Sequence, residues 1–125
     1  MASPSEEKYL EEIYYAVLKN GYTSVTEMAI SLNVSVSSVT KMVQKLSKEG
    51  YLYYKRYEKI RMTEKGLLKG ETLAYNHQIL EEFFHLIELD KDQIPQEVAN
   101  IEYHISGNAV SKIRDFISKE KYEVN

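Results

Sequence analysis

The chain has 125 residues, of which 43% are hydrophobic, and it contains no cysteine. This length fits one compact domain or a small domain with an extension, and the apolar fraction can fill a core, which excludes wholesale disorder. The lack of cysteine excludes disulfides, thiolate zinc sites and cysteine nucleophiles. Because no apolar run approaches the ~18 residues of a membrane span and no secretory leader is recognisable, we expect a cytoplasmic protein without a membrane segment.

The net charge of −3 conceals a strong asymmetry along the sequence. Between Ser35 and Lys65 there are eight lysines and arginines against three glutamates, a balance of +5, whereas the remainder has 8 basic and 16 acidic residues, a balance of −8. A basic block inside an acidic protein predicts one surface for a polyanion, with the rest repelling it. The alternative is a solvated helix and hairpin whose lysines are incidental.

Helical periodicity and turn residues predict the N-terminal elements in chain order. The run Ser3–Glu6 combines a capping serine, a proline and a glutamate three residues on, and the apolar stripe that follows ends near Gly21. A short helix follows Ser24. After a turn, a third helix begins near Ser35 and ends at Gly50. This order is typical of a helix-turn-helix.

The rest of the chain predicts a hairpin and then helices only. The runs YLYYKR and KIRMT are rich in aromatic and β-branched residues and are joined near Tyr57, which indicates a β-hairpin. Thr63 is placed to cap a long helix that extends past Phe84. Two further helices are predicted over about 93–105 and 108–119. The fold class is therefore mainly α, a winged helix-turn-helix with an all-helical extension.

The third predicted helix has the polar face that reading the major groove requires. With its apolar stripe packed inward, it presents hydroxyls near its N-terminus and amide and ammonium groups further along. Gln44 suits an adenine edge and Lys41 a guanine, whereas Thr40, Lys45 and Lys48 suit phosphates. The candidate DNA-binding residues of this helix are Ser37, Ser38, Thr40, Lys41, Gln44, Lys45 and Lys48.

The predicted hairpin extends the basic face toward flanking phosphates or the minor groove. Its tyrosines are interpreted mainly as packing residues or phosphate donors, because a duplex offers few exposed bases for stacking. A winged-helix module that binds proteins and no duplex is the rival interpretation. An enzyme is not expected, because neither a glycine-rich phosphate loop nor an activated nucleophile is present. The candidate DNA-binding residues of the hairpin are Lys55, Arg56, Lys59 and Arg61.

Three stretches, VSSVTKMVQKLSKEGYL, LYYKRYEKIRMTEKG and NHQILEEFF, resemble the diphtheria toxin repressor family, and especially its short, manganese-responsive branch. The resemblance runs over nearly the whole chain, spacing included. It implies a homodimer whose recognition helices and wings bind a palindromic double-stranded operator. It further implies a winged helix-turn-helix DNA-binding domain over residues 1–70 and an all-helical dimerisation domain, ancestrally metal-binding, over residues 71–125.

The resemblance also implies a site for Mn²⁺ or another divalent metal, but the ligand pattern is incomplete. The family pattern expects four carboxylates and two imidazoles. Three positions match, Glu11, His77 and Glu102, and three do not, Lys8, Ala99 and Tyr103. The metal site is therefore predicted to be degenerate, with metal dependence weakened or lost. The cofactor alternatives are Mn²⁺, another divalent metal, or none.

Several interpretations of these residues are open. In the first, the ammonium of Lys8 replaces the metal by bridging Glu11 and Glu102, and DNA binding needs no metal. In the second, Glu11, His77 and Glu102 hold an ion completed by water, and the protein is a fully metal-activated manganese-responsive repressor. Without a metal role, Glu11 would form a surface salt bridge and His77 would be a hydrogen-bonded core histidine. His104, about 200° from Glu102 on a helix, is predicted to be a surface or interface histidine and not a ligand.

Overall fold

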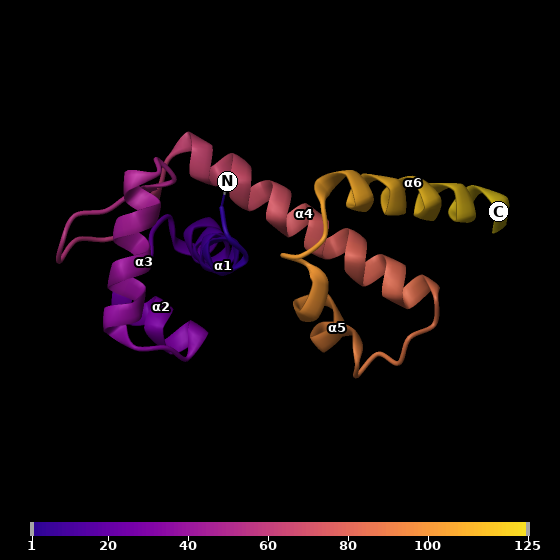
Figure 1. Cartoon of the computed structure of the whole chain (residues 1–125), viewed down its shortest axis with the longest axis horizontal. Coiled ribbons are helices and arrows are strands. Elements are labelled where there is room, and N and C mark those ends of the chain that lie inside the picture. The colour runs from indigo at the N-terminus through magenta and orange to yellow at the C-terminus, as the bar shows by residue number, and fades with distance from the viewer. Residues whose placement is uncertain (1, 125) are drawn as a thin grey trace. The chain divides into compact units, whose positions relative to one another are not determined.

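The computed structural model describes the backbone of residues 2–124 and the side chains of residues 2–121. It divides into two compact units, Met1–Thr72 and Leu73–Asn125. None of the described helices is both long and apolar enough to cross a membrane. The elements, labelled in Figure 1, are α1 (Pro4–Asn20), α2 (Val25–Leu32), α3 (Val36–Lys48), β1 (Leu52–Tyr53), β2 (Arg61–Met62), α4 (Glu64–Leu86), α5 (Ile94–Ile101) and α6 (Gly107–Val124).

The helices of the N-terminal unit begin and end where local side chains satisfy the free backbone groups. The hydroxyl of Ser3 accepts the N–H of Glu6 at 3.2 Å, which caps α1, and the hydroxyl of Ser35 accepts a backbone N–H at 3.1 Å at the start of α3. Gly21 ends α1 with φ +84°, and Asn33 ends α2 with φ +56°. Both adopt the left-handed conformation that glycine and asparagine tolerate best. The predicted N-terminal helices are confirmed.

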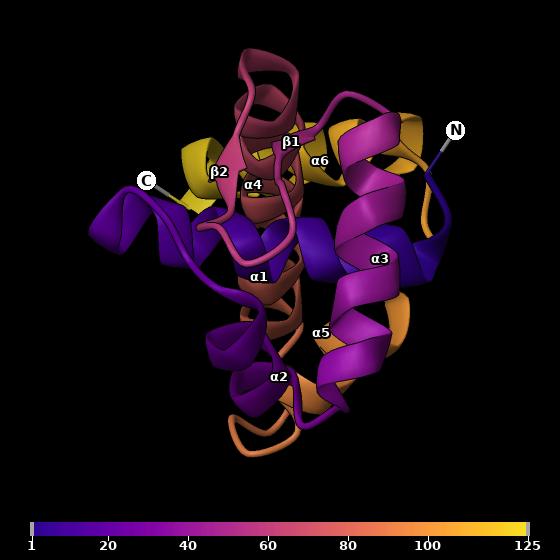
Figure 2. The ribbon, with the colours of Figure 1, turned by 90° about the vertical axis from the view of Figure 1, so that its left-hand side faces the viewer.

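The hairpin between α3 and α4 is confirmed, with shorter strands than the aromatic runs indicate. β1 and β2 are antiparallel, with Leu52 opposite Met62 and Tyr53 opposite Arg61. A bridge between residues 23 and 60 adds the segment before α2 to its edge. Below, this hairpin, residues 52–62, is called the wing. Figure 2 looks onto α3 and the wing.

The core of the N-terminal unit is built from the inward faces of its three helices and the wing. Leu10 and Ile13 of α1 and Ile60 of the wing are each 0% exposed. Met28 of α2 and Leu52 of β1 are also buried. Three helix faces and a two-stranded hairpin thus share one apolar interior, which fixes the orientation of α3 within the unit.

The start of α4 packs against its own unit through two glycines. The hydroxyl of Thr63 accepts the N–H of Gly66 at 3.0 Å, so the predicted cap is confirmed. A Cβ on Gly66 would overlap the carbonyl of Tyr51, and a Cβ on Gly70 would overlap the ring of Tyr14 on α1. Both positions therefore require close approach by a bare backbone.

In the C-terminal unit, two apolar clusters hold α4, α5 and α6 together. Leu80, Ile94 and Val98 form one cluster, and Ile79, Val110 and Ile117 form the other. The predicted extent of α5 is wrong: the helix ends at Ile101, four residues before the expected end, and a turn follows. The hydroxyl of Ser106 accepts the N–H of Ala109 at 3.0 Å and caps α6, so the chain must leave the α5 helix earlier.

We predict that Gly70→Ala lowers the free energy of unfolding by about 1–3 kcal/mol, because the new methyl group meets the base of the Tyr14 ring and not a flexible chain end. Denaturant unfolding of the purified chain measures this. Gly107→Ala is the control, since a Cβ there has no neighbour within 4 Å, and its change should stay within about 0.5 kcal/mol. Equal stability of the two variants would contradict the packing assigned to Gly70.

Candidate DNA-binding surface and metal ligands

One face of α3 is buried and the opposite face carries the predicted DNA-binding side chains. Val39, Val43 and Leu46 are each 0% exposed and anchor the helix. Thr40 is half-buried, and its hydroxyl donates to the carbonyl of Val36 at 2.9 Å. The other predicted residues of this helix are exposed: Ser37, Ser38, Lys41, Gln44, Lys45 and Lys48.

The first turn of α3 is ordered by its own serines. The hydroxyl of Ser35, which caps the helix, also donates to the hydroxyl of Ser38 at 2.8 Å. The hydroxyl of Ser37 lies 3.3 Å from that of Ser35. The serine hydroxyls can make further hydrogen bonds in addition to these contacts. They lie at the exposed N-terminus of the helix, where a phosphate or a base edge would approach.

Lys45 of α3 forms an ion pair with Glu6 of α1 at 2.9 Å, and the Glu6 side chain is only 5% exposed. The hydrogen bond from Lys45 lowers the pKa of Glu6 below its ordinary value, against the opposing effect of burial. The same bond raises the pKa of Lys45. From the sequence, Glu6 was predicted only as a capping residue, because no periodicity connects two positions 39 residues apart.

The wing brings its basic residues beside the polar face of α3. Lys55, Arg56, Lys59 and Arg61 are all exposed, as expected for phosphate contacts. A polar hollow between the two elements is lined by Gln44, Ser47, Lys48, Tyr54 and Arg56. Gln44 and Lys48 of the helix and Arg56 of the wing, predicted separately, thus line the same hollow. Below, the basic surface means the exposed cations Lys41, Lys45, Lys48, Lys55, Arg56, Lys59 and Arg61.

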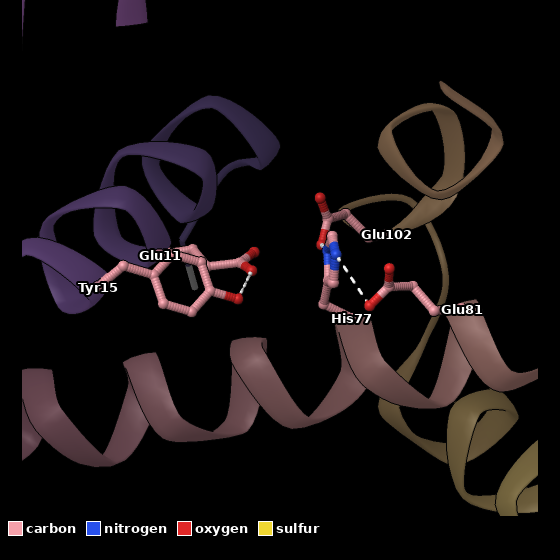
Figure 3. Close-up of polar contacts among 5 residues, drawn as sticks. All are labelled: Glu11, Tyr15, His77, Glu81 and Glu102. Carbon is pink, nitrogen blue, oxygen red and sulfur yellow. Dashed lines mark hydrogen bonds and ion pairs between the residues drawn. The ribbon is translucent and has the colours of Figure 1, made fainter. Parts of the chain in front are cut away.

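In the C-terminal unit, two of the three matching metal-ligand positions lie in contact. The Nδ1 atom of His77 on α4 lies 2.8 Å from Oε2 of Glu102, and its Nε2 atom lies 3.5 Å from Oε1 of Glu81. Figure 3 shows the imidazole with a carboxylate at each side. The side chain of Glu102 is 8% exposed and that of His77 is 30% exposed. Glu81 was not among the predicted site residues, although its position one helical turn after His77 was a usable signal.

Glu11 lies on α1 in the N-terminal unit and is 2% exposed, so its interpretation as a surface salt bridge is wrong. Its Oε2 atom accepts a hydrogen bond from the hydroxyl of Tyr15, one turn further along, at 2.6 Å (Figure 3). Lys8 is exposed. Among the described residues of this unit, it forms no ion pair with Glu11. A bridging role for the Lys8 ammonium therefore has no support from its position on α1.

The remaining positions of the expected ligand pattern carry neither a carboxylate nor an imidazole. Ala99 on α5 is exposed and Tyr103 is half-buried in the turn after it. His104 is exposed, as predicted, although it lies in that turn and not on a helix. One imidazole and two carboxylates suit a divalent ion that prefers oxygen and nitrogen donors, with water completing its coordination.

Two family models match consecutive parts of the chain. The one described as iron dependent repressor, N-terminal DNA binding domain, matches residues 1–60. The one described as iron dependent repressor, metal binding and dimerisation domain, matches residues 63–123. Between them they cover both units.

Two curated relatives are similar to this chain over most of their length. The HTH-type transcriptional regulator MntR of Geobacillus thermodenitrificans is 44% identical over 117 residues, covering 94% of this chain and 83% of the relative. MntR of Bacillus subtilis is 43% identical, with coverages of 94% and 82%. The solved structure of the manganese regulator SloR has a TM-score of 0.75 and 25% identity over 90% of this chain. The chain spans about half of that solved protein, 53% of its length.

We predict that the Lys45–Glu6 pair makes stability pH-dependent. Because the pKa of Glu6 is lowered from 4.5, its contribution is complete above pH 4.5 and is lost as the pH falls through the lowered value. Because the pKa of Lys45 is raised from 10.5, the contribution of the lysine is lost as the pH rises through the raised value. Denaturant unfolding at a series of pH values measures both limbs.

In this experiment Glu6→Gln should be less stable at neutral pH and should lose less stability in acid than the unmodified chain. Glu71→Gln, at an exposed position of α4, is the matched control and should keep the original profile. An acid limb that is unchanged in Glu6→Gln would refute the assignment.

Proposed function

The chain belongs to the iron-dependent repressor family, and we propose that it reads a palindromic operator through the basic surface and that its response to metal is weakened. It is a homodimeric DNA-binding transcriptional regulator and not an enzyme. We further propose that it acts as a repressor in the cytoplasm. The observation that supports operator reading is the exposed polar face of α3 next to the cationic wing.

In the proposed complex, α3 enters the major groove and the wing contacts flanking backbone. Gln44 would pair with an adenine edge and Lys41 with a guanine, because their amide and ammonium groups match those edges. Ser37 and Ser38 would meet the groove at the helix N-terminus. The other assigned side chains would neutralise phosphates, which position the protein without specifying sequence; these are Thr40, Lys45, Lys48, Lys55, Arg56, Lys59 and Arg61.

For the metal we propose Glu11, His77 and Glu102 as the donors of one divalent ion. Manganese is the first candidate, because the relative SloR is described as a manganese regulator. When bound, the ion would supply positive charge to the two carboxylates. The 2.8 Å contact between His77 and Glu102 supports a shared role for these two side chains.

We propose weakened metal dependence because three of the six ligand positions of the family pattern carry other residues. Affinity for a hard divalent ion depends on the number of charged oxygen ligands. Ala99 and Tyr103 supply none, and Lys8 places a cation one helical turn before Glu11. Lys8 would thus act by repelling an ion at Glu11. The second candidate function, a fully metal-activated repressor, is favoured only by the contact between His77 and Glu102.

We predict that Mn²⁺ changes the operator affinity of the unmodified chain by less than about tenfold, or about 1.4 kcal/mol. The measurement is fluorescence anisotropy with a duplex selected by the chain from a randomised pool, with chelator and with added Mn²⁺. Lys8→Asp should increase the metal response, because it replaces a repelling cation with a carboxylate. Lys19→Asp, the same charge change in the last turn of α1, should not. A metal-induced gain of about a thousandfold in the unmodified chain would establish the metal-activated alternative.

We predict a steep salt dependence of operator binding, with log Kd changing by about 0.9 per neutralised phosphate for each decade of salt. Lys48→Gln should reduce this slope by about one phosphate equivalent, while Gln44→Ala should weaken selected duplexes and leave the slope unchanged. Lys91→Gln, at an exposed position in the C-terminal unit, is the control for charge alone. No duplex binding even in dilute buffer would instead support the protein-interaction module.

A further inference from the structure

We propose that Tyr22, between α1 and α2, is a positioning residue for DNA binding: its ring is a platform that holds the wing cations Lys59 and Arg61. This inference rests on the proposed function. The Nζ atom of Lys59 lies 3.8 Å from the centre of the Tyr22 ring, and Cζ of Arg61 lies 5.8 Å from it. Both distances are within the range of about 6 Å in which an aromatic face attracts a cation.

The backbone fixes Tyr22 beside the wing. Gly21 turns the chain out of α1 with φ +84°. Thr23 then pairs with Ile60, giving its N–H to the carbonyl of Ile60 at 3.0 Å and accepting the N–H of Ile60 at 2.8 Å. Thr23 and Ile60 are both 0% exposed. Tyr22 therefore precedes a buried, doubly hydrogen-bonded bridge, and its position relative to the wing is set by backbone geometry.

The wing presents both cations to the same ring because of strand alternation. Lys59 and Arg61 flank Ile60, and side chains two residues apart on an extended strand point to the same side. Ile60 points inward to the core, so its neighbours point outward, and both are exposed. Tyr22 is half-buried, which leaves its ring partly covered and partly open to the cations.

The other cation–ring contacts of this unit do not combine these properties. Lys65 lies 4.4 Å from the ring centre of Tyr51, but its ammonium also donates to the carbonyl of Glu49 at 2.7 Å. Arg56 lies 5.0 Å from the ring centre of Tyr57, its sequence neighbour, which is 89% exposed. Tyr22, by contrast, contacts two cations from a different segment of the chain. The backbone next to Tyr22 is hydrogen-bonded to the wing through Thr23 and Ile60.

Such a platform favours DNA binding by ordering the wing before the duplex arrives. Long basic side chains lose rotamer freedom when they contact a phosphate, and two adjacent cations repel each other. An aromatic ring shared by both side chains reduces the entropy loss, because it already restricts each side chain in the free protein. It also offsets the repulsion, because the two charges have a common attractive partner. Removal of the ring should therefore weaken binding through Lys59 and Arg61 alone.

The test compares Tyr22→Phe and Tyr22→Leu in the full chain, by operator anisotropy over a range of salt concentrations. Tyr22→Phe keeps the aromatic face and should bind within about twofold of the unmodified chain. Tyr22→Leu should bind about three- to tenfold more weakly, with a shallower salt dependence. Thermal unfolding of each variant verifies that the chain is folded at the assay temperature.

The decisive control is the background Lys59→Gln/Arg61→Gln, in which the platform has no cations to hold. Tyr22→Leu should produce no further loss of affinity there, as expected for coupled residues. A loss of equal size in both backgrounds, or normal binding by Tyr22→Leu, overturns the inference while leaving the regulator assignment intact. A failure of the unmodified chain to bind any duplex would instead refute the proposed function itself.

Discussion

The structure of the N-terminal unit depends on the fact that α3 can be packed from one side only. Val39, Val43 and Leu46 are completely buried, so the opposite side of the helix is committed to solvent or to a ligand. The left-handed Asn33 at the end of α2 and the cap at Ser35 at the start of α3 set the turn that allows the two helices to share one core. A change that rotated α3 about its axis would bury its ammonium groups, which is too costly without partners.

A surface that concentrates like charges must be ordered against its own repulsion. This chain uses two chemically different partners for that purpose. The buried carboxylate of Glu6 holds Lys45 from beneath the helix, and the ring of Tyr22 lies against Lys59 and Arg61 of the wing. A carboxylate cancels a charge at the surface, whereas an aromatic ring attracts a cation and leaves its net charge available to phosphate. The wing keeps more of its electrostatic strength as a result.

Local features of the fold were predictable from sequence because they arise between near neighbours. Serine and threonine caps together with helical apolar spacing identified α1, α2, α3 and the start of α4. The end of α5 was mispredicted because Ile101 and Ile105 keep helical spacing whether or not the hydrogen bonds continue. The relevant signal was Ser106, whose capping of α6 competes with continuation of α5.

Contacts between distant segments were not predictable in the same way. The pairing of Glu6 with Lys45, and of Tyr22 with Lys59, depends on how helices and wing pack, and no periodicity in the sequence encodes it. The burial of Glu11 was missed for a related reason. A glutamate in the middle of an amphipathic helix is usually exposed, and only the fold shows that its side is covered. The sequence therefore indicated which residues are candidates for the site, but it did not indicate their burial or their charged partners.

Charge balance clarifies why an incomplete donor set can still be specific. Two carboxylates and a neutral imidazole carry a charge of −2, which matches one divalent ion. Four carboxylates would exceed that charge and would favour more than one ion. The residues Lys8, Ala99 and Tyr103 thus leave half of the donors and half of the negative charge of the full pattern. For the proposed donor set, this charge balance favours a single weakly held ion over a cluster, and the proposed operator binding would then depend mainly on the basic surface.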